Sequence, residues 1–317
     1  MKILIIRFSS IGDIVLTTPV IRCLKIQAAQ VTVHYATKKQ YQVILENNPY
    51  IDRVFYLENK LNDLIVQLKN EQYDWVIDLH NNLRTRIIKW KLGVQSYSFN
   101  KLNLEKWLMV NLKINRLPDV HIVDRYLKTI QPLGIKNDGL SLDYFIPEKD
   151  EVPLSWFPLT HRQGFIAYAI GAQHETKKLP VKRMIELCKN INRPMVLLGG
   201  KEDYENGETV SLAVGEMIFN TCGKLNLNQS ASLVKQAQYV FTHDTGLMHI
   251  AAAFKKEVYV LWGNTIPAFG MYPYRTKFTS LENIHLRCRP CSKIGYNKCP
   301  KGHFKCMNEI DLKITLP

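Results

Sequence analysis

The sequence of 317 residues predicts an α/β protein with two doubly wound domains, each a parallel sheet covered by helices. Three observations predict this class. Short apolar runs alternate with amphipathic helical stretches, which is typical of a parallel sheet with helices on both faces. The alternation stops between about residues 132 and 163 and then restarts. The length also favours about two domains. We therefore expect an N-terminal domain at 1–150 and a C-terminal domain at 151–317.

The first domain is expected to contain four strands, each followed by a helical stretch. Pro19 falls early enough to occupy a first or second helical turn. Residues 101–131 are largely helical in character, but the pattern there is too weak to give boundaries. The expected strands are Lys2–Arg7, Val31–Ala36, Ile51–Tyr56 and Tyr73–Leu79, and the expected helical stretches are Asp13–Gln27, one that begins near Thr37, Leu61–Asn70 and Arg84–Leu92.

The second domain is expected after a break in the pattern. Residues 132–163 hold prolines, glycines and charges without a sustained period, which indicates a linker and an edge strand. The expected strands are Gly164–Ile170, Pro194–Leu198, Met217–Asn220, Tyr239–Thr242 and Val258–Trp262, and the expected helices are Pro180–Asn190, Asn228–Gln236 and Leu247–Phe254.

The chain is strongly basic. Lys and Arg number 42 against 28 acidic residues, for a net charge of +14. Such an excess indicates an anionic partner, and nucleic acid, a phosphorylated substrate and an acidic lipid surface all meet this description. No apolar run reaches the roughly 18 residues of a membrane span, and the N-terminus lacks the pattern of a signal peptide. We expect a cytoplasmic protein that can contact the inner membrane surface.

The loop after the first strand carries the residues Ser9, Ser10, Gly12 and Asp13. Ligands of doubly wound sheets bind outside the carboxyl ends of the strands, so this polar loop is a candidate site. Gly12 would allow a tight turn before the helix. The simpler reading is that Asp13 or Ser10 only caps the helix. The glycine-rich fingerprint of dinucleotide binding is missing, which argues against NAD.

Two loops of the second domain are also polar. In Ala172–Pro180, Lys177 and its neighbour Lys178 stand beside Thr176 and could clamp a phosphate, although a solvated basic loop has the same composition. In Thr242–Ala253, a small-residue helix begins directly after a buried strand. The N–H groups of Thr245 and Gly246 at its start would form an anion site. His249 would face the same site or serve as a structural histidine.

Four motifs together resemble one known family. They are "RFSSIGDIVLTTPVIRCLK" at 7–25, "DLHNNLRT" at 78–85, "ETKKLP" at 175–180, and "HDTGLMHIAAA" at 243–253 followed by "VLWGNTIP". In this order they are similar to the ADP-heptose:lipopolysaccharide heptosyltransferases. The resemblance covers nearly the whole chain. It implies a GT-B fold of two Rossmann-like domains, in which the N-terminal domain binds the acceptor and the C-terminal domain binds the nucleotide sugar across a cleft.

The resemblance also implies roles for individual residues. Asp13 matches the general base of an inverting transfer, and Lys177 matches the lysine beside the donor diphosphate. Leu179 replaces the aromatic residue of the family pattern two positions later. The donor-binding turn corresponds to Asp244, Thr245, Gly246 and His249. The implied partners are ADP-heptose or a similar nucleotide sugar and an anionic lipopolysaccharide core, with no nucleic acid and no catalytic cofactor.

The C-terminal segment is rich in cysteine. Cys288, Cys291, Cys299 and Cys306 comprise one C-x₂-C pair and two more widely spaced thiols. Four thiols over this distance are enough for a structural zinc, with His303 as an alternate ligand, and they are equally consistent with reduced cysteines.

Two rival functions remain open from the sequence. One is a transferase of the same fold that uses another nucleotide sugar, and the other is a basic nucleic-acid-associated protein. The dispersed lysines and the absence of interleaved aromatic residues argue against the latter.

Overall fold

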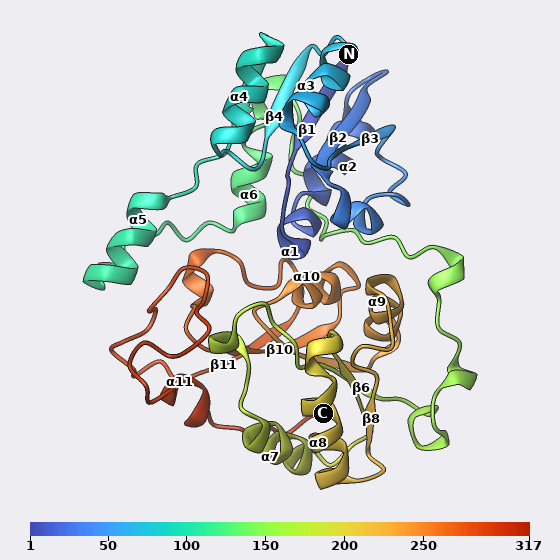
Figure 1. Ribbon diagram of the computed structural model, residues 1–317, viewed down its shortest axis with the longest axis vertical. Coiled ribbons are helices and arrows are strands. Elements are labelled where there is room, and N and C mark those ends of the chain that lie inside the picture. Colours follow the sequence, from blue (N-terminus) through green and yellow to red (C-terminus); the bar gives the residue numbers. More distant parts are fainter. The chain divides into compact units, whose positions relative to one another are not determined.

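The computed structural model describes all 317 residues and divides into two compact units (Figure 1). Unit 1 comprises residues 1–101 and 120–145, and unit 2 comprises 102–119 and 146–317. The division at 145/146 is close to the expected boundary at 150/151. The assignment of 102–119 to unit 2 was not expected, because the sequence pattern there is weak. No helix is both long enough and apolar enough to cross a lipid bilayer.

Unit 1 is built on a five-stranded parallel sheet of order β3-β2-β1-β4-β5. All four expected strands are confirmed, and a short fifth strand, β5, was missed. The elements of unit 1 are β1 (Lys2–Ile6), α1 (Ile11–Val15), α2 (Thr18–Gln27), β2 (Thr32–Lys38), η1 (Lys39–Ile44), β3 (Arg53–Leu57), α3 (Leu61–Lys69), β4 (Trp75–Asp78), α4 (Leu83–Leu92), β5 (Gln95–Ser98), α6 (Ile122–Leu127) and η3 (Gln131–Leu133).

Two expected helices of unit 1 differ from the prediction. The stretch 13–27 is two helices, because α1 ends at Val15 and α2 begins at Thr18 with Pro19 in its first turn. The helix expected from Thr37 is wrong at its start. There β2 continues to Lys38, and only a 3₁₀ turn follows it.

Unit 2 is built on a six-stranded parallel sheet of order β11-β10-β9-β6-β7-β8. The five expected strands are confirmed. The edge strand expected within 132–163 is absent, since that stretch forms 3₁₀ turns, and α8 and β11 were missed. The elements of unit 2 are α5 (Asn103–Trp107), η2 (Leu108–Leu112, a π-helix), η4 (Glu148–Asp150), η5 (Leu154–Trp156), η6 (Leu159–His161), β6 (Ile166–Ala169), η7 (Glu175–Lys177), α7 (Val181–Ile191), β7 (Met195–Leu198), η8 (Lys201–Asp203), α8 (Tyr204–Val214), β8 (Ile218–Asn220), α9 (Leu227–Gln236), β9 (Tyr239–His243), α10 (Gly246–Ala253), β10 (Glu257–Trp262), η9 (Pro267–Phe269), β11 (Phe278–Glu282) and α11 (Lys305–Asn308).

Each sheet has its own hydrophobic core. In β1, all four apolar residues of 3–6 are fully buried, as expected for a central parallel strand with helices on both faces. In α7, Met184, Leu187, Cys188 and Ile191 are buried at the spacing of one helical face and pack in the core of unit 2. Burial of each such side chain contributes about 1.5–3 kcal/mol. The strands are therefore fixed tightly, and the polar loops at their carboxyl ends have a rigid base.

Candidate active site

Asp13 lies in the first helical turn after β1, and both of its carboxylate oxygens have partners. Oδ2 accepts hydrogen bonds from the backbone N–H of Ser10 (3.1 Å) and from its hydroxyl (2.8 Å). Oδ1 forms an ion pair with Arg7 Nη2 at 2.6 Å. The side chain of Asp13 keeps 19% of its surface exposed. Asp13 therefore caps α1 and still presents a carboxylate that an acceptor hydroxyl can reach.

Arg7 is the partner that holds Asp13 in place, and the sequence analysis did not single it out. Its guanidinium is buried and donates to the carbonyls of Ser9 (2.7 Å) and Leu79 (2.6 Å) and to the Tyr126 hydroxyl (3.0 Å). Burial alone would lower the pKa of Arg7, but the adjacent Asp13 carboxylate raises it above its usual value. The signal that could have found Arg7 is a charged residue directly after a buried strand.

The other two residues of the predicted acceptor loop have structural positions. Gly12 is buried as the second residue of α1, so the tight turn expected at Gly12 is wrong, and the chain turns before the helix. The Ser9 carbonyl accepts from Arg7 Nε. Ser9 thus contributes its backbone to the arrangement around Asp13.

His80 is a second residue at this edge that the sequence analysis missed. It follows β4, the neighbour of β1 in the sheet, and its ring packs edge-on against Phe8 with 5.5 Å between the ring centres. Burial, together with the charge of Arg7, lowers the pKa of His80 to about 4. Its Nδ1 is buried without a hydrogen-bond partner in the protein. A neutral imidazole with one ring nitrogen unpaired in the protein therefore lies at the same sheet edge as Asp13.

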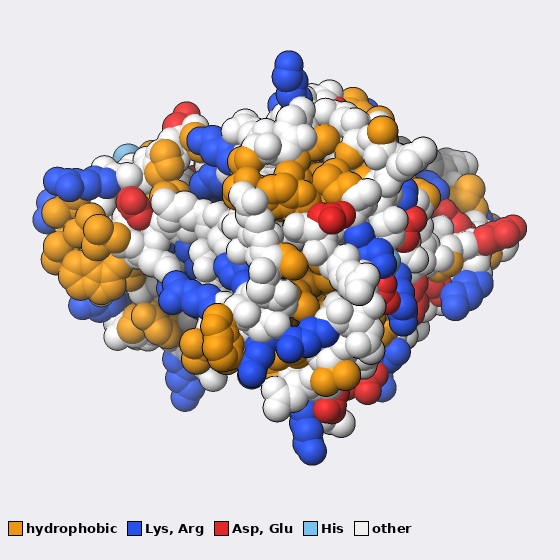
Figure 2. All heavy atoms as spheres, turned by 90° about the horizontal axis from the view of Figure 1, so that it is seen from above, with side chains coloured by type: hydrophobic (Ala, Val, Ile, Leu, Met, Phe, Trp, Pro, Cys, Tyr) orange, Lys and Arg blue, Asp and Glu red, His pale blue; other side chains and the backbone are white.

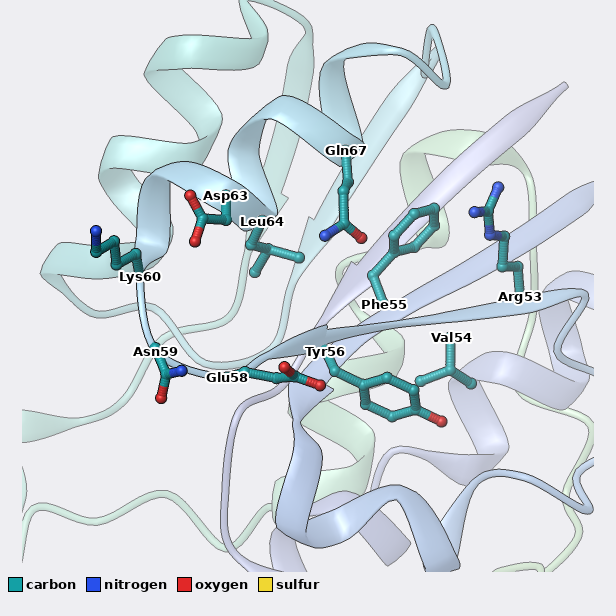
Figure 3. A pocket seen from close by; sticks show the side chains of 10 residues that line it. All are labelled: Arg53, Val54, Phe55, Tyr56, Glu58, Asn59, Lys60, Asp63, Leu64 and Gln67. Carbon is teal, nitrogen blue, oxygen red and sulfur yellow. The ribbon is translucent and has the colours of Figure 1, made fainter.

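A separate hollow of about 290 Å³ lies between β3 and α3 (Figure 3). Its lining combines the carboxylates of Glu58 and Asp63 with the cations of Arg53 and Lys60. None of the predicted site residues lines it.

In unit 2, Lys177 and Asp244 meet at the carboxyl edge of the sheet. Lys177 Nζ donates to Asp244 Oδ2 (2.6 Å) and to the Asp244 carbonyl (3.1 Å), and the Thr265 hydroxyl donates to the same Oδ2 (2.9 Å). These residues follow β6, β9 and β10, which are neighbours in the sheet. The arrangement joins three loops at one point.

The α10 helix begins beside this group. Thr245 is the extended residue that precedes the helix, and Gly246 is its first residue. The first N–H groups of a helix have no partner within the helix and carry its positive dipole end. A cation and a helix N-terminus therefore lie side by side, which is the environment that a diphosphate requires.

Two predicted donor residues of this region have internal roles. The Thr176 hydroxyl accepts from Tyr296 N (2.8 Å) and donates to Tyr296 O (3.0 Å), so most of its bonding capacity is used within the protein. His249 is buried within α10. These positions favour structural roles for both residues. For His249, a structural histidine is one of the two roles expected from the sequence.

Lys178 is not placed to clamp a phosphate together with Lys177. It is buried and forms ion pairs with Asp203 (3.0 Å) and Glu175 (2.8 Å). Burial alone would lower its pKa, but hydrogen bonds with these two carboxylates raise it. Lys178 therefore anchors the loop, and Lys177 is the one of the pair that meets the α10 terminus.

His243, the last residue of β9, positions the lysine loop. Its Nε2 accepts from the backbone N–H of Leu179 at 2.9 Å, and its side chain is fully buried. Burial lowers the pKa of His243 to about 3, so the ring is a neutral acceptor at physiological pH. The Leu179 substitution noted in the sequence places an apolar side chain in the core next to this bond.

The loop after β10 carries a donor-site candidate that the sequence analysis missed. Asn264 is 1% exposed, and both polar atoms of its side-chain amide lack a partner in the protein. The preceding Gly263 packs so closely that a Cβ there would lie 2.4 Å from Thr176 O. Because only glycine allows this approach, the loops that hold Lys177 and Asn264 are pressed together. An unpaired buried amide at this point is available to a bound ligand.

The cysteine-rich segment braces both loops. Arg289 is buried and donates to the carbonyls of Gly263 (2.6 Å) and Thr265 (2.9 Å), and it also pairs with Glu282 (2.9 Å). Tyr296 holds Thr176 from the other side through the bonds described above. From the sequence, this segment is expected only to supply thiols.

The four cysteines do not form a metal centre in this structure. Cys288 Sγ lies 3.9 Å from His303 Nε2, but no three or more His, Cys, Asp or Glu side chains are arranged to hold a metal ion. Cys306 is buried, and Cys288, Cys291 and Cys299 are half-buried. A zinc site at these cysteines therefore stays a prediction from their spacing.

These features define a class: two parallel-sheet units, with a cation at a helix N-terminus in one and a carboxylate at a strand end in the other. Residues 62–300 match the model of glycosyltransferase family 9 (heptosyltransferase), and the chain belongs to this family. It is therefore a glycosyltransferase.

Individual relatives agree with this assignment. Lipopolysaccharide heptosyltransferase 1 of Campylobacter coli is 26% identical over 293 residues, which is 84% of either chain. Among solved structures, the Escherichia coli ADP-heptose lipopolysaccharide heptosyltransferase II has a TM-score of 0.72 at 20% identity and covers 98% of both chains. The E. coli heptosyltransferase WaaC with ADP has a TM-score of 0.67 at 18% identity, over 89% of this chain and 93% of that one. The fold is GT-B, as expected.

Proposed function

We propose that the protein transfers a heptose from ADP-heptose to the inner core of lipopolysaccharide, with inversion at the anomeric carbon. The observation that carries this proposal is the group of Lys177, Asp244 and Thr265 beside the α10 N-terminus in a chain of family 9. The relatives named as lipopolysaccharide heptosyltransferases and the ADP complex of a protein with the same fold support the choice of donor and acceptor.

In the proposed reaction, Lys177 and the α10 terminus bind the diphosphate of the donor. The bond between the anomeric carbon and the diphosphate oxygen breaks, and the negative charge on ADP grows as it leaves. A fixed cation and backbone N–H groups stabilise this charge more in the transition state than in the bound donor. The Lys177 charge also removes the need for a metal ion at the diphosphate, so we propose that transfer is metal-independent.

Asp13 supplies the base. It accepts the proton of the acceptor hydroxyl while the hydroxyl oxygen attacks the anomeric carbon from the face opposite the leaving diphosphate, and this geometry inverts the configuration. The carboxylate of Asp13 is held by Ser10 and Arg7, and its side chain keeps 19% of its surface exposed. Arg7 keeps the carboxylate oriented throughout.

The proposed acceptor determines where in the cell we expect the protein to act. Lipopolysaccharide core is anionic and linked to lipid, and the net charge of +14 suits such a substrate. We propose that the protein works in the cytoplasm at the inner membrane surface and that nucleic acid is not a partner.

The test is a transfer assay with matched donors. Purified protein is incubated with a lipopolysaccharide core acceptor and ADP-heptose, ADP-glucose or a UDP-sugar, and release of the nucleoside diphosphate and the mass of the acceptor are followed. We expect transfer with ADP-heptose, with unchanged rate in EDTA. Transfer only from a UDP-sugar would assign the protein to another donor, and retention on DNA with no transfer from any donor would overturn the proposal.

A further inference from the structure

The segment 102–116 of unit 2 exposes a row of large apolar side chains. Leu104, Trp107, Leu112 and Ile114 are 67%, 53%, 54% and 45% exposed. The first three are spaced at i, i+3 and i+8 along α5 and η2, which places them on one helical face. Figure 1 shows α5 at the far left of the picture, and Figure 2 shows hydrophobic side chains gathered with Lys and Arg side chains at the left of its view.

These two short helices are poorly buried. Neither α5 nor η2 contains a buried residue. Isolated helices shorter than about 12–15 residues are marginal in water, and most helical stability comes from an apolar face packed on something else. The face of Leu104 and Trp107 therefore lacks the partner that would stabilise it.

The charges around this face are mostly positive. Between 101 and 118, Lys101, Lys106, Lys113 and Arg116 stand against the single acidic residue Glu105. A helix with exposed Trp and Leu on one side and basic residues around them is typical of segments that lie in a membrane interface.

Lys113 fastens this segment to the cysteine-rich segment. Its Nζ donates to the carbonyls of Pro290 (2.6 Å) and Val110 (2.7 Å), with the Cys288 carbonyl at 3.3 Å. Burial lowers the pKa of Lys113. Lys113 is exposed, and its ammonium group joins the segment that carries α5 and η2 to the cysteine-rich segment.

The segment to which Lys113 is fastened has the same character. Ile294 and Tyr296 are 52% and 43% exposed. Residues 287–305 contain no acidic residue, and their basic residues are Arg287, Arg289, Lys293, Lys298, Lys301 and Lys305. The two segments together combine exposed apolar side chains with an excess of positive charge.

We propose that residues 102–116, with the loop 293–301, form the surface by which the protein binds an anionic lipid membrane. Leu104 and Trp107 enter the interface between headgroups and acyl chains, and Lys106, Arg116 and the lysines of the loop contact acidic headgroups. The inference rests on the proposed function in that a lipid-linked acceptor is what brings the protein to a membrane. The charge excess favours a lipid surface over a second copy of this chain, since a second copy would bring the same positive charge.

The experiment is co-sedimentation of the full chain with vesicles of phosphatidylcholine, with and without phosphatidylglycerol. The wild type is compared with Leu104→Ser/Trp107→Ser, and with Leu159→Ser/Leu212→Ser as a control that removes apolar side chains of 77% and 86% exposure elsewhere in unit 2. We expect wild type and control to bind vesicles with phosphatidylglycerol and to release them at high salt. The Leu104→Ser/Trp107→Ser variant should bind these vesicles at least about tenfold more weakly, because it lacks the apolar surface that the two side chains bury in the membrane.

Transfer to a soluble, delipidated core acceptor separates this inference from the proposed function. The Leu104→Ser/Trp107→Ser variant should transfer sugar to it at the wild-type rate, which also shows that the variant is folded. Wild-type protein that transfers sugar but does not bind anionic vesicles overturns the lipid surface and leaves the function intact. The lipid surface is also overturned if both double variants bind vesicles more weakly by the same factor. It is overturned too if the wild type is a dimer and only the Leu104→Ser/Trp107→Ser variant is a monomer.

Discussion

The Lys177 ammonium lies 2.6 Å from Asp244 Oδ2, and this ion pair lies where the chain begins α10. In the absence of donor, the carboxylate neutralises the lysine. We propose that Lys177 turns from Asp244 to the donor diphosphate, which brings more negative charge than the carboxylate, while Thr265 continues to hold Asp244. The pair keeps the lysine positioned before the donor arrives.

Lys177→Ala should lower turnover as well as ADP affinity, because the charge on ADP grows during transfer. We expect a loss in kcat/KM of about 10² or more, which corresponds to roughly 3 kcal/mol. Steady-state kinetics and ADP calorimetry measure the two effects, with the exposed Lys182→Ala as control. A raised KM with intact kcat would mean that Lys177 contacts the donor only in its ground state.

Gly246→Val, at the first residue of α10, should weaken ADP binding more than Thr245→Ala. A β-carbon at Gly246 obstructs the approach of a phosphate to the helix N–H groups, whereas Thr245→Ala leaves the backbone unchanged. Calorimetry with ADP measures both. If Gly246→Val and Lys177→Ala each bind ADP as tightly as wild type, the diphosphate binds elsewhere.

Asp13→Asn should reduce turnover by roughly 10²- to 10⁴-fold while ADP affinity stays close to wild type. Because the change also leaves the buried Arg7 without its ion pair, thermal stability should fall as well. Ser10→Ala is the matched control. It removes one hydrogen bond to Asp13, so it should cost about 1 kcal/mol of stability with most of the turnover kept. Near-wild-type turnover of Asp13→Asn would show that Asp13 only caps the α1 helix and is not the base.

Arg289→Ala should weaken donor binding indirectly, because the Arg289 side chain holds the carbonyls of a loop at the donor site. Loss of the guanidinium leaves the carbonyls of Gly263 and Thr265 without their donor and frees the loop that holds Asn264 and Thr265. We expect ADP affinity to fall about tenfold and Arg289→Lys to restore only part of it, because lysine cannot reach both carbonyls in one plane. The exposed Arg287→Ala should bind ADP like wild type.

Stability should fall as the pH drops below about 6.5. In the folded state the pKa of His243 is lowered from 6.5 to about 3, so the unfolded chain binds a proton in this window that the folded chain does not. The contribution is complete above pH 6.5 and is lost as the pH falls towards 3, by about 1.4 kcal/mol per pH unit. Denaturant unfolding at pH 7 and pH 5 should show a smaller difference in free energy for His243→Gln than for the exposed control His285→Gln. An equal difference in both variants would show that other groups cause the pH dependence.

The sequence predicted the sheets well because their strands are continuous apolar runs, as in Lys2–Ile6, and buried parallel strands leave few alternatives. It also placed Asp13, Lys177 and Asp244 at strand ends, and the structure brings Lys177 and Asp244 into contact. The roles of these residues in the reaction stay predictions.

What the sequence could not show depends on contacts between distant segments. Nothing near Thr176 reveals that its hydroxyl meets Tyr296, which lies 120 positions later. The neutral His80 and the buried Asn264 depend in the same way on burial by other loops. The zinc prediction came from cysteine spacing alone. Metal analysis of protein purified without added zinc tests it: about one equivalent per chain supports it, and titration of all four thiols without metal refutes it.

The chain forms unit 2 from two separate stretches, because residues 102–119 belong to it together with 146–317. A fragment that starts at residue 146 would lose Lys113 and its bond to Pro290, and with it one support of the segment that carries Arg289. Exchange of C-terminal halves between related transferases has the same weakness. A chimera joined near residue 146 pairs the cysteine-rich segment of one parent with the 102–119 segment of the other, so functional recombinants should require that both pieces come from the same parent.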